Sequence, residues 1–280
     1  MATLSPSSLP FLGAGLGYRR AIREFYQRPG LPLGFLEVMP EHILDASAAA
    51  RAALAADTRN RPVVTHSVSL SVGTATGPDR RFLPKMARIN RRYKVPWCSD
   101  HLCFTKIGKQ TIGQLTPIPY TDDSLRVVVA NVAEVQRAVG VPFLIENISQ
   151  YFQFPGNTFE EPDFMAEVAK KTGCGVLLDV TNLRNNAANL GTDAQRYLAA
   201  FPLERLVQFH LAGSEWVDGH LLDTHGTAIH DEVWKLTKQV IDASDVRALL
   251  IERDQTFGSL KRLEAEVRKA DKLMQGASGA

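Results

Sequence analysis

Cysteine, long hydrophobic runs and net charge are all scarce in this sequence. Its three cysteines, Cys98, Cys103 and Cys174, cannot all pair within one chain, and none lies in a CxxC motif. A disulfide-stabilised fold and a thiolate zinc site are therefore not expected, whereas a reducing compartment is. No apolar run approaches the roughly 20 residues of a membrane span, and the N-terminus lacks the basic start and apolar stretch of a secretion signal. We expect a cytoplasmic protein with no membrane partner.

The charges nearly cancel, because 32 Lys and Arg oppose 30 Asp and Glu, for a formal net charge of +2. This excess is too small to indicate a polyanionic partner. The segment 79–94 holds seven basic residues against one acidic residue, and such a segment could follow phosphates. A solvated outer helix or a partner surface is the preferred interpretation, so nucleic acid is not an expected partner.

Short apolar runs alternate with helix-like segments along the whole chain. The predicted strands are 10–15, 34–38, 62–66, 97–101, 142–147, 175–180, 205–210 and 248–253. The predicted helices are 18–28, 46–58, 79–94, 122–139, 158–172, 192–200, 228–242 and 257–273. Eight strands alternating with eight helices predict an α/β fold, a (β/α)8 TIM barrel. An open doubly wound sheet shares the alternation, but its GxGxxG loop is absent, since GAGLGY has the wrong spacing. One barrel domain over 1–274 and a disordered tail over 275–280 are expected.

Seven consecutive predicted strands carry a metal-ligand residue at or beside the carboxyl end. These residues are Glu37, His66, His101, Glu146, Asp179, His210 and Glu252. In a barrel those ends converge on one mouth. The nearby basic residues Arg184 and Arg253 are too few to neutralise so many carboxylates, whereas a group of metal ions could. The set therefore predicts a metal site at the carboxyl ends of the strands.

A further segment, HLLDTHG, places Asp223 and His225 two residues apart. In an extended segment alternate side chains point the same way, so the two could bind one ion, with Asn182 completing a set of three ligands. The remaining histidines, His42, His220 and His230, are expected at the surface or behind the ligands, and Cys103 as a buried structural thiol. Imidazole and carboxylate ligands suit iron, manganese or zinc, and the sequence does not choose among them.

The chain resembles the multinuclear non-heme iron-dependent oxidative enzymes of the methanobactin-biosynthesis and 3-thiaglutamate-forming type, formerly a family of unknown function. The matching stretches are LGAGLGYR (12–19), FLEVMPEH (35–42), HSVSLSVG (66–73), SDHLCF (99–104), ENISQYF (146–152), GVLLDVTNL (175–183), FHLAGS (209–214), DTHG (223–226) and IERD (251–254). One departure is His42, where the family pattern has Asn, which suggests a variant substrate loop.

The resemblance implies three metal positions at the mouth of the barrel. The first is formed by His66, His101 and Glu146; the second shares Glu146 and adds Asp179, His210 and Glu252; the third uses Asn182, Asp223 and His225. Glu37, Asn147 and Arg253 are expected to bind substrate or to support the ligands.

The resemblance also implies a reaction and its partners. Two or three iron ions, mixed Fe(II) and Fe(III), would use dioxygen as co-substrate to oxidise a cysteine of a ribosomally synthesised precursor peptide. A small leader-binding protein is expected to form a heterodimer with the chain, because no segment of it looks like a recognition domain. Three alternatives stay open: an apurinic-endonuclease-like hydrolase with three metals, a sugar isomerase, and a non-enzymatic metal-binding scaffold.

Overall fold

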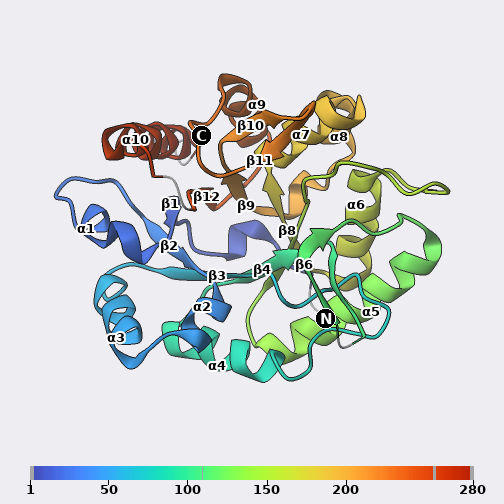
Figure 1. Ribbon diagram of the computed structural model, residues 1–280, viewed down its shortest axis with the longest axis horizontal. Coiled ribbons are helices and arrows are strands. Elements are labelled where there is room, and N and C mark those ends of the chain that lie inside the picture. The colour runs from blue at the N-terminus through green and yellow to red at the C-terminus, as the bar shows by residue number, and fades with distance from the viewer. Residues whose placement is uncertain (1–2, 109, 255–256, 278–280) are drawn as a thin grey trace.

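Eight parallel strands close into a barrel in the computed structural model, which describes residues 3–108, 110–254 and 257–277. The strands are β1 (Gly13–Gly17), β2 (Phe35–Val38), β3 (Val63–Ser67), β4 (Cys98–His101), β7 (Phe143–Glu146), β8 (Gly175–Asp179), β9 (Leu206–Leu211) and β12 (Ala248–Ile251). Their order around the barrel is β1-β12-β9-β8-β7-β4-β3-β2, so barrel strands that follow one another along the chain are neighbours. Figure 1 shows the strands at the centre with the helices around them. The predicted TIM barrel is confirmed.

Most of the helices that surround the barrel lie close to the predicted segments. They are α1 (Arg23–Tyr26), α2 (Pro40–Asp45), α3 (Ala48–Asp57), α4 (Leu83–Tyr93), α5 (Asp122–Val139), α6 (Glu161–Thr172), α7 (Val180–Leu190), α8 (Ala194–Ala200), α9 (Asp231–Ile241) and α10 (Leu260–Ala277). The basic segment 79–94 contains the outer helix α4, which packs beside α5. Helix α10 covers the first three residues of the predicted tail, and residues 278–280 lie outside the described residues. None of the described helices is both long and apolar enough to cross a bilayer.

Two helices and two hairpins were not predicted from the sequence. Helix α2 begins two residues after the end of β2, and α7 begins immediately after β8. The side chain of Asp179 caps α7 by accepting a hydrogen bond from Asn182 N at 2.8 Å, which offsets the poor helix propensity of its several Asn residues. The hairpins are β5 (Phe104–Ile107) with β6 (Gln110–Thr116), and β10 (Ser214–Val217) with β11 (His220–Asp223).

The barrel interior is layered because side chains alternate along each strand. The polar strand-end residues form the top layer. An apolar cluster lies beneath them and includes Phe35, Val64, Trp97, Leu144, Leu177 and Leu250. Strand β1 has a glycine, Gly15, beside this apolar cluster, because a Cβ at that position would collide with the ring of Phe35. The glycine therefore makes room for an aromatic side chain that closes the barrel below the site.

Candidate metal centre

A cavity of about 300 Å³ opens at the carboxyl ends of the strands. Eight of the nine predicted ligands line it, namely His66, His101, Glu146, Asp179, Asn182, Asp223, His225 and Glu252. The ninth, His210, is fully buried within the barrel. The structure thus brings together side chains from β3, β4, β7, β8, β9, α7, β11 and the segments that follow β11 and β12.

The first predicted group forms a nearly equilateral triangle of donor atoms. His66 Nε2 lies 3.3 Å from both His101 Nε2 and Glu146 Oε2, and the third side, from His101 Nε2 to Glu146 Oε2, is 3.5 Å. Three ligands about 2.1 Å from one tetrahedral ion lie about 3.4 Å apart. On its other side the imidazole of His66 contacts Ser99 Oγ at 2.8 Å through Nδ1, so Nε2 is the nitrogen directed at the cavity.

Glu146 presents its two oxygens to different histidines. Oε2 faces His66 and His101, whereas Oε1 lies 3.0 Å from His210 Nδ1. Glu146, Asp179 and His210 offer ligand atoms within 4.8 Å of one another, as the second predicted group requires. This is the geometry of a carboxylate that can bridge two ions.

Glu252 connects the second group to the third. Its Oε1 lies 3.5 Å from His210 Nδ1, and its Oε2 lies 3.5 Å from His225 Nε2. His225 Nε2 in turn lies 2.7 Å from Asp223 Oδ2. The two residues do converge, although not through an extended segment: β11 ends at Asp223, and His225 has a left-handed backbone with φ of 52°. Its N–H donates to Gly213 O at 3.0 Å, which fixes this turn.

Asn182 reaches the same cavity from the first turn of α7. Its side-chain oxygen accepts a hydrogen bond of 2.5 Å from Ser149 Oγ, and its Nδ2 donates to Asn147 O at 3.3 Å. The amide nitrogen of Asn182 is therefore occupied by the backbone of Asn147. Its oxygen is the atom able to bind a cation, and the Ser149 hydroxyl that donates to it can rotate away.

The donor set fits metal ions. Glu146 Oε2 and Asp223 Oδ1 are buried and have no hydrogen-bond partner among the described residues, a costly arrangement unless a cation meets them. Burial and the nearby carboxylates of Asp223, Glu146 and Glu252 raise the pKa of Asp179 well above its ordinary value. Burial lowers the pKa of His66 to about 4, so this imidazole is neutral at pH 7 and its lone pair is free to bind a metal.

The opposite side of His210 is held by a chain of hydrogen bonds that the sequence reasoning missed. Its Nε2 lies 3.0 Å from Glu37 Oε2. Gln208 Nε2 donates to the same oxygen at 2.6 Å, and Trp97 Nε1 donates to Gln208 Oε1 at 2.7 Å. Because indole is only a donor, Trp97 fixes the orientation of the Gln208 amide. An ion held by Glu37, His66 and His210 is geometrically possible, but Glu37 is already hydrogen bonded, so we assign it to orienting His210.

The pKa of His210 is set by two opposing effects, its burial and the carboxylates around it, and the effect of the carboxylates is the larger. Burial alone would lower the pKa of His210, whereas Glu146, Glu37 and Glu252 together raise it well above its usual value. Metal binding and protonation of His210 Nδ1 compete.

Two residues expected to bind substrate or to support the ligands have clear positions. Asn147 clamps the ends of β7 and β8, since its Oδ1 accepts from Asp179 N at 2.8 Å and its Nδ2 donates to Asp179 O at 3.0 Å. Arg253 does not line the cavity; it points toward α10 and pairs with Glu266 at 2.5 Å. Cys103 is fully buried and also lies outside the cavity lining.

Arg19 and Asp254 form a second support that was not predicted. Asp254 Oδ2 lies 3.1 Å from His225 Nδ1, and its Oδ1 pairs with Arg19. The carboxylate therefore orients the imidazole so that Nε2 faces Asp223 and Glu252. The other three histidines stay outside the cavity lining, with His42 and His220 exposed and His230 bonded to Ser214 O at 2.9 Å.

Residues 13–275 match the sequence model of a family described as RiPP precursor modification enzyme MbnB/TglH/ChrH, where RiPP denotes a ribosomally synthesised and post-translationally modified peptide. The chain belongs to this family. Curated relatives of similar length agree. A UPF0276 protein of Chromobacterium violaceum is 40% identical over 245 residues, 88% of each chain. One of Anaeromyxobacter sp. is 36% identical over 269 residues, 96% of this chain and 95% of the relative. The resemblance drawn from the motifs is confirmed.

Solved structures outside the MbnB/TglH/ChrH family share the barrel. A xylose isomerase domain protein from Planctomyces limnophilus has a TM-score of 0.64 at 12% identity and covers 97% of this chain and 100% of its own. Endonuclease IV from Thermus thermophilus has a TM-score of 0.57 at 15% identity, over 94% and 99%. A D-psicose 3-epimerase has a TM-score of 0.55 at 14% identity, over 95% and 97%. These likenesses show the fold alone.

Proposed function

We propose that the protein is a multinuclear iron enzyme that uses dioxygen to oxidise a cysteine of a ribosomally synthesised precursor peptide. Membership of a family of precursor-modifying enzymes suggests an enzyme and a peptide substrate. The observation that carries the multinuclear part is the position of Glu146, whose two oxygens face two separate histidine groups. A barrel with a single-metal site would not need a carboxylate shared in this way.

The nine predicted ligands would hold the ions as three neighbouring groups. His66, His101 and Glu146 would form the first; Glu146, Asp179, His210 and Glu252 the second; and Asn182, Asp223 and His225 the third. Bound iron would supply sites for dioxygen and for the substrate thiolate and would carry electrons from the substrate to dioxygen, which is the oxidant.

The protein's own residues would orient the ligands and shape the entrance. Ser99 holds His66, Asp254 holds His225, and Glu37 holds His210, so each imidazole keeps one nitrogen directed at the cavity. The remaining lining includes Met39, Val68 and Leu115, which limit access of water. At about 300 Å³ the cavity is at the small end of ligand pockets, so it suits a side chain and its neighbours in a peptide.

Exposed aromatic side chains beside the entrance support a peptide or protein partner. Tyr151 lines the cavity and is 43% exposed, and its neighbour Phe152 is 48% exposed. Trp216, 61% exposed, lies on the β10–β11 hairpin, whose His220 ring is 6.2 Å from that of Tyr151. Large exposed aromatics near a site often mark binding surfaces. We assign this surface to the precursor peptide together with a small leader-binding protein.

The test is a reconstitution under anaerobic conditions with ferrous iron, followed by addition of a Cys-containing precursor peptide from a neighbouring gene and then of oxygen. A change in peptide mass that requires iron, oxygen and the cysteine is expected. A His101→Ala variant should abolish it, and a peptide with Ser in place of Cys should stay unmodified. Zinc-dependent cleavage of abasic DNA without oxygen, or epimerisation of a ketose, would instead favour the hydrolase or isomerase alternative.

A further inference from the structure

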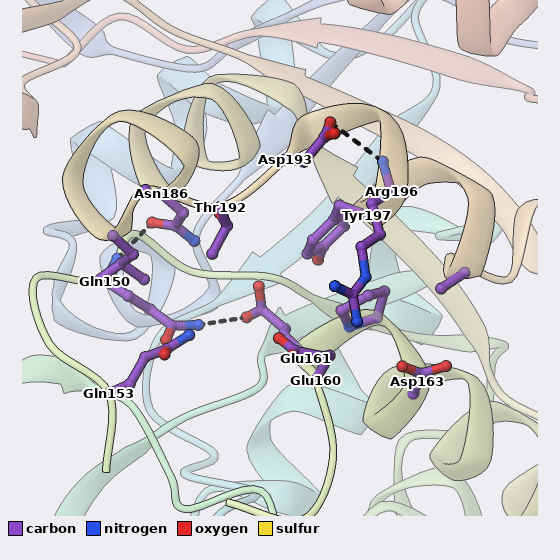
Figure 2. Close-up of a pocket in the computed structure, with 14 residues that line it drawn as sticks. Gln150, Gln153, Glu160, Glu161, Asp163, Asn186, Thr192, Asp193, Arg196 and Tyr197 are labelled. Carbon is purple, nitrogen blue, oxygen red and sulfur yellow. Dashed lines mark hydrogen bonds between the residues drawn. The ribbon is translucent and has the colours of Figure 1, made fainter. Parts of the chain in front are cut away.

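A second cavity, of about 310 Å³, lies outside the barrel and shares no lining residue with the metal cavity. It is enclosed by the loop after β7, the first turn of α6, the C-terminal end of α7 and helix α8 (Figure 2). Its wall contains the amides of Gln150 and Asn186, and α8 contributes Arg196 and Tyr197. No part of the proposed oxidation uses these residues.

Glu161 is the buried acid of this cavity. It is only 7% exposed, and its Oε1 accepts hydrogen bonds from Tyr120 Oη at 2.9 Å and from Gln150 Nε2 at 2.8 Å. Figure 2 shows its other oxygen directed into the cavity, between Thr192 and Tyr197. Within residues 3–108, 110–254 and 257–277, no Lys, Arg or His side chain forms an ion pair with this carboxylate. A buried carboxylate that meets only neutral donors lacks the cation that normally accompanies it.

The titratable groups around Glu161 do not supply that cation. Tyr120 and Tyr197 face it, and burial raises the pKa of both phenols well above the usual value, so both stay neutral. Burial likewise raises the pKa of Glu161 to about 7, although its hydrogen bonds oppose the increase. On α8, Arg196 is exposed and forms no ion pair with Glu161. The acid is therefore poised between its charged and neutral forms near neutral pH.

The surroundings are negative. Glu160 and Asp163 on one side and Asp193 on the other add three exposed carboxylates to the lining, against the single guanidinium of Arg196. A neighbouring hollow of about 560 Å³ shares Glu160, Glu161 and Asp163. Such a field raises the local concentration of cations. The cavity holds roughly ten times the volume of one water, which suits an organic group better than a metal ion with its close shell of oxygens.

We propose that this cavity binds an organic cation, an ammonium or guanidinium group, with Glu161 as its counter-ion. The neutral donors and acceptors of Gln150, Thr192 and Tyr197 would surround the cation. The group can belong to a free amine or to a Lys or Arg side chain of a bound peptide, and both sources share this chemistry. The site is independent of the proposed oxidation.

The experiment measures binding by calorimetry to the full chain in phosphate buffer free of amines. The probes are N-acetyl-arginine methylamide, N-acetyl-lysine methylamide and agmatine, with N-acetyl-citrulline methylamide as the neutral analogue of the arginine probe. Saturable binding of at least one cation is expected, with citrulline at least about tenfold weaker. With a pKa of about 7, Glu161 is about ten times less ionised at pH 6 than at pH 8, so affinity should fall about tenfold between them. Tighter binding of the capped amino acids than of agmatine identifies a peptide side chain as the source, and the reverse a free amine.

Two variants separate the buried acid from its exposed neighbour. Glu161→Gln keeps the shape and should abolish binding, whereas Glu160→Gln should leave it within about twofold, because that side chain is exposed. If Glu161→Gln does not fold, the pH dependence of the unmodified protein and the citrulline comparison still decide. Equal binding of citrulline, unchanged binding by folded Glu161→Gln, binding independent of pH, or no binding of any cation would each overturn the proposal.

Discussion

Replacing Glu146 by Gln is the perturbation that tests the bridge most sharply, since Gln matches Glu in size but loses one oxygen and the charge. Glu146 Oε2 lies 3.3 and 3.5 Å from the ligand nitrogens of His66 and His101, and Oε1 lies 3.0 Å from His210 Nδ1. Both metal groups therefore lose a direct ligand in a single substitution. Removal of a mere supporting partner costs about 10–100-fold in metal affinity. We expect at least about 100-fold at each of the two positions, or about 2.8 kcal/mol per ion.

The assay is metal content per chain after anaerobic loading and exhaustive dialysis, together with affinity from chelator competition. Glu146→Gln should lose two ions together. Asp179→Asn is the matched control, because it removes a carboxylate of the same cavity that belongs to the second group alone. It should lose one ion and keep the one at His66 and His101. Loss of only one ion from Glu146→Gln, with the second bound at unchanged affinity, would refute the bridging role.

Three further predictions concern the interior and the buried acid. Trp97→Phe leaves a buried amide oxygen below the metal centre unpaired, so urea unfolding should show a loss of about 1–3 kcal/mol, against no measurable change for the exposed Trp216→Phe. Gly15→Ala should lower the free energy of unfolding by about 1–3 kcal/mol or more, and adding Phe35→Leu should cost less than the sum of the single changes, whereas additivity would argue against the clash. Glu161 holds its proton more tightly in the folded protein, where its pKa is raised from 4.5 to about 7. Its contribution to the free energy of unfolding is therefore fully present below pH 4.5 and is lost as the pH rises through 7. Relative to Glu161→Gln, the unmodified protein should lose about 3 kcal/mol of stability over that range in amine-free buffer; parallel curves would contradict the raised pKa.

Most of the candidate site was predictable because barrel geometry turns a position along a strand into a position in space. The carboxyl ends of all eight strands lie around one mouth, so His66, His101, Glu146 and His210 could be placed near one another without coordinates. The alternation of side chains along a strand also indicates the position of Gln208, which was not predicted. Gln208 lies two residues before His210 and therefore points into the same interior, where it joins the chain of hydrogen bonds.

The features that were missed depend on contacts that local patterns do not encode. Helix α7 is rich in Asn and looks like a turn, yet the cap by Asp179 and its packing on the barrel make it helical. The left-handed backbone of His225 is set by its hydrogen bond to Gly213 O. Glu161 reads as an ordinary acid in the first turn of a helix; only the fold shows that α8 and the loop after β7 bury it beside a cavity.

The central claim is that the barrel mouth holds several iron ions joined by shared carboxylates. The most direct measurement is anomalous diffraction on either side of the iron absorption edge, from crystals of protein purified and loaded without oxygen. We predict at least two iron peaks, one contacted by His66, His101 and Glu146 and a second contacted by Glu146 and His210. A single peak, or peaks that follow the zinc edge instead of the iron edge, would contradict the account.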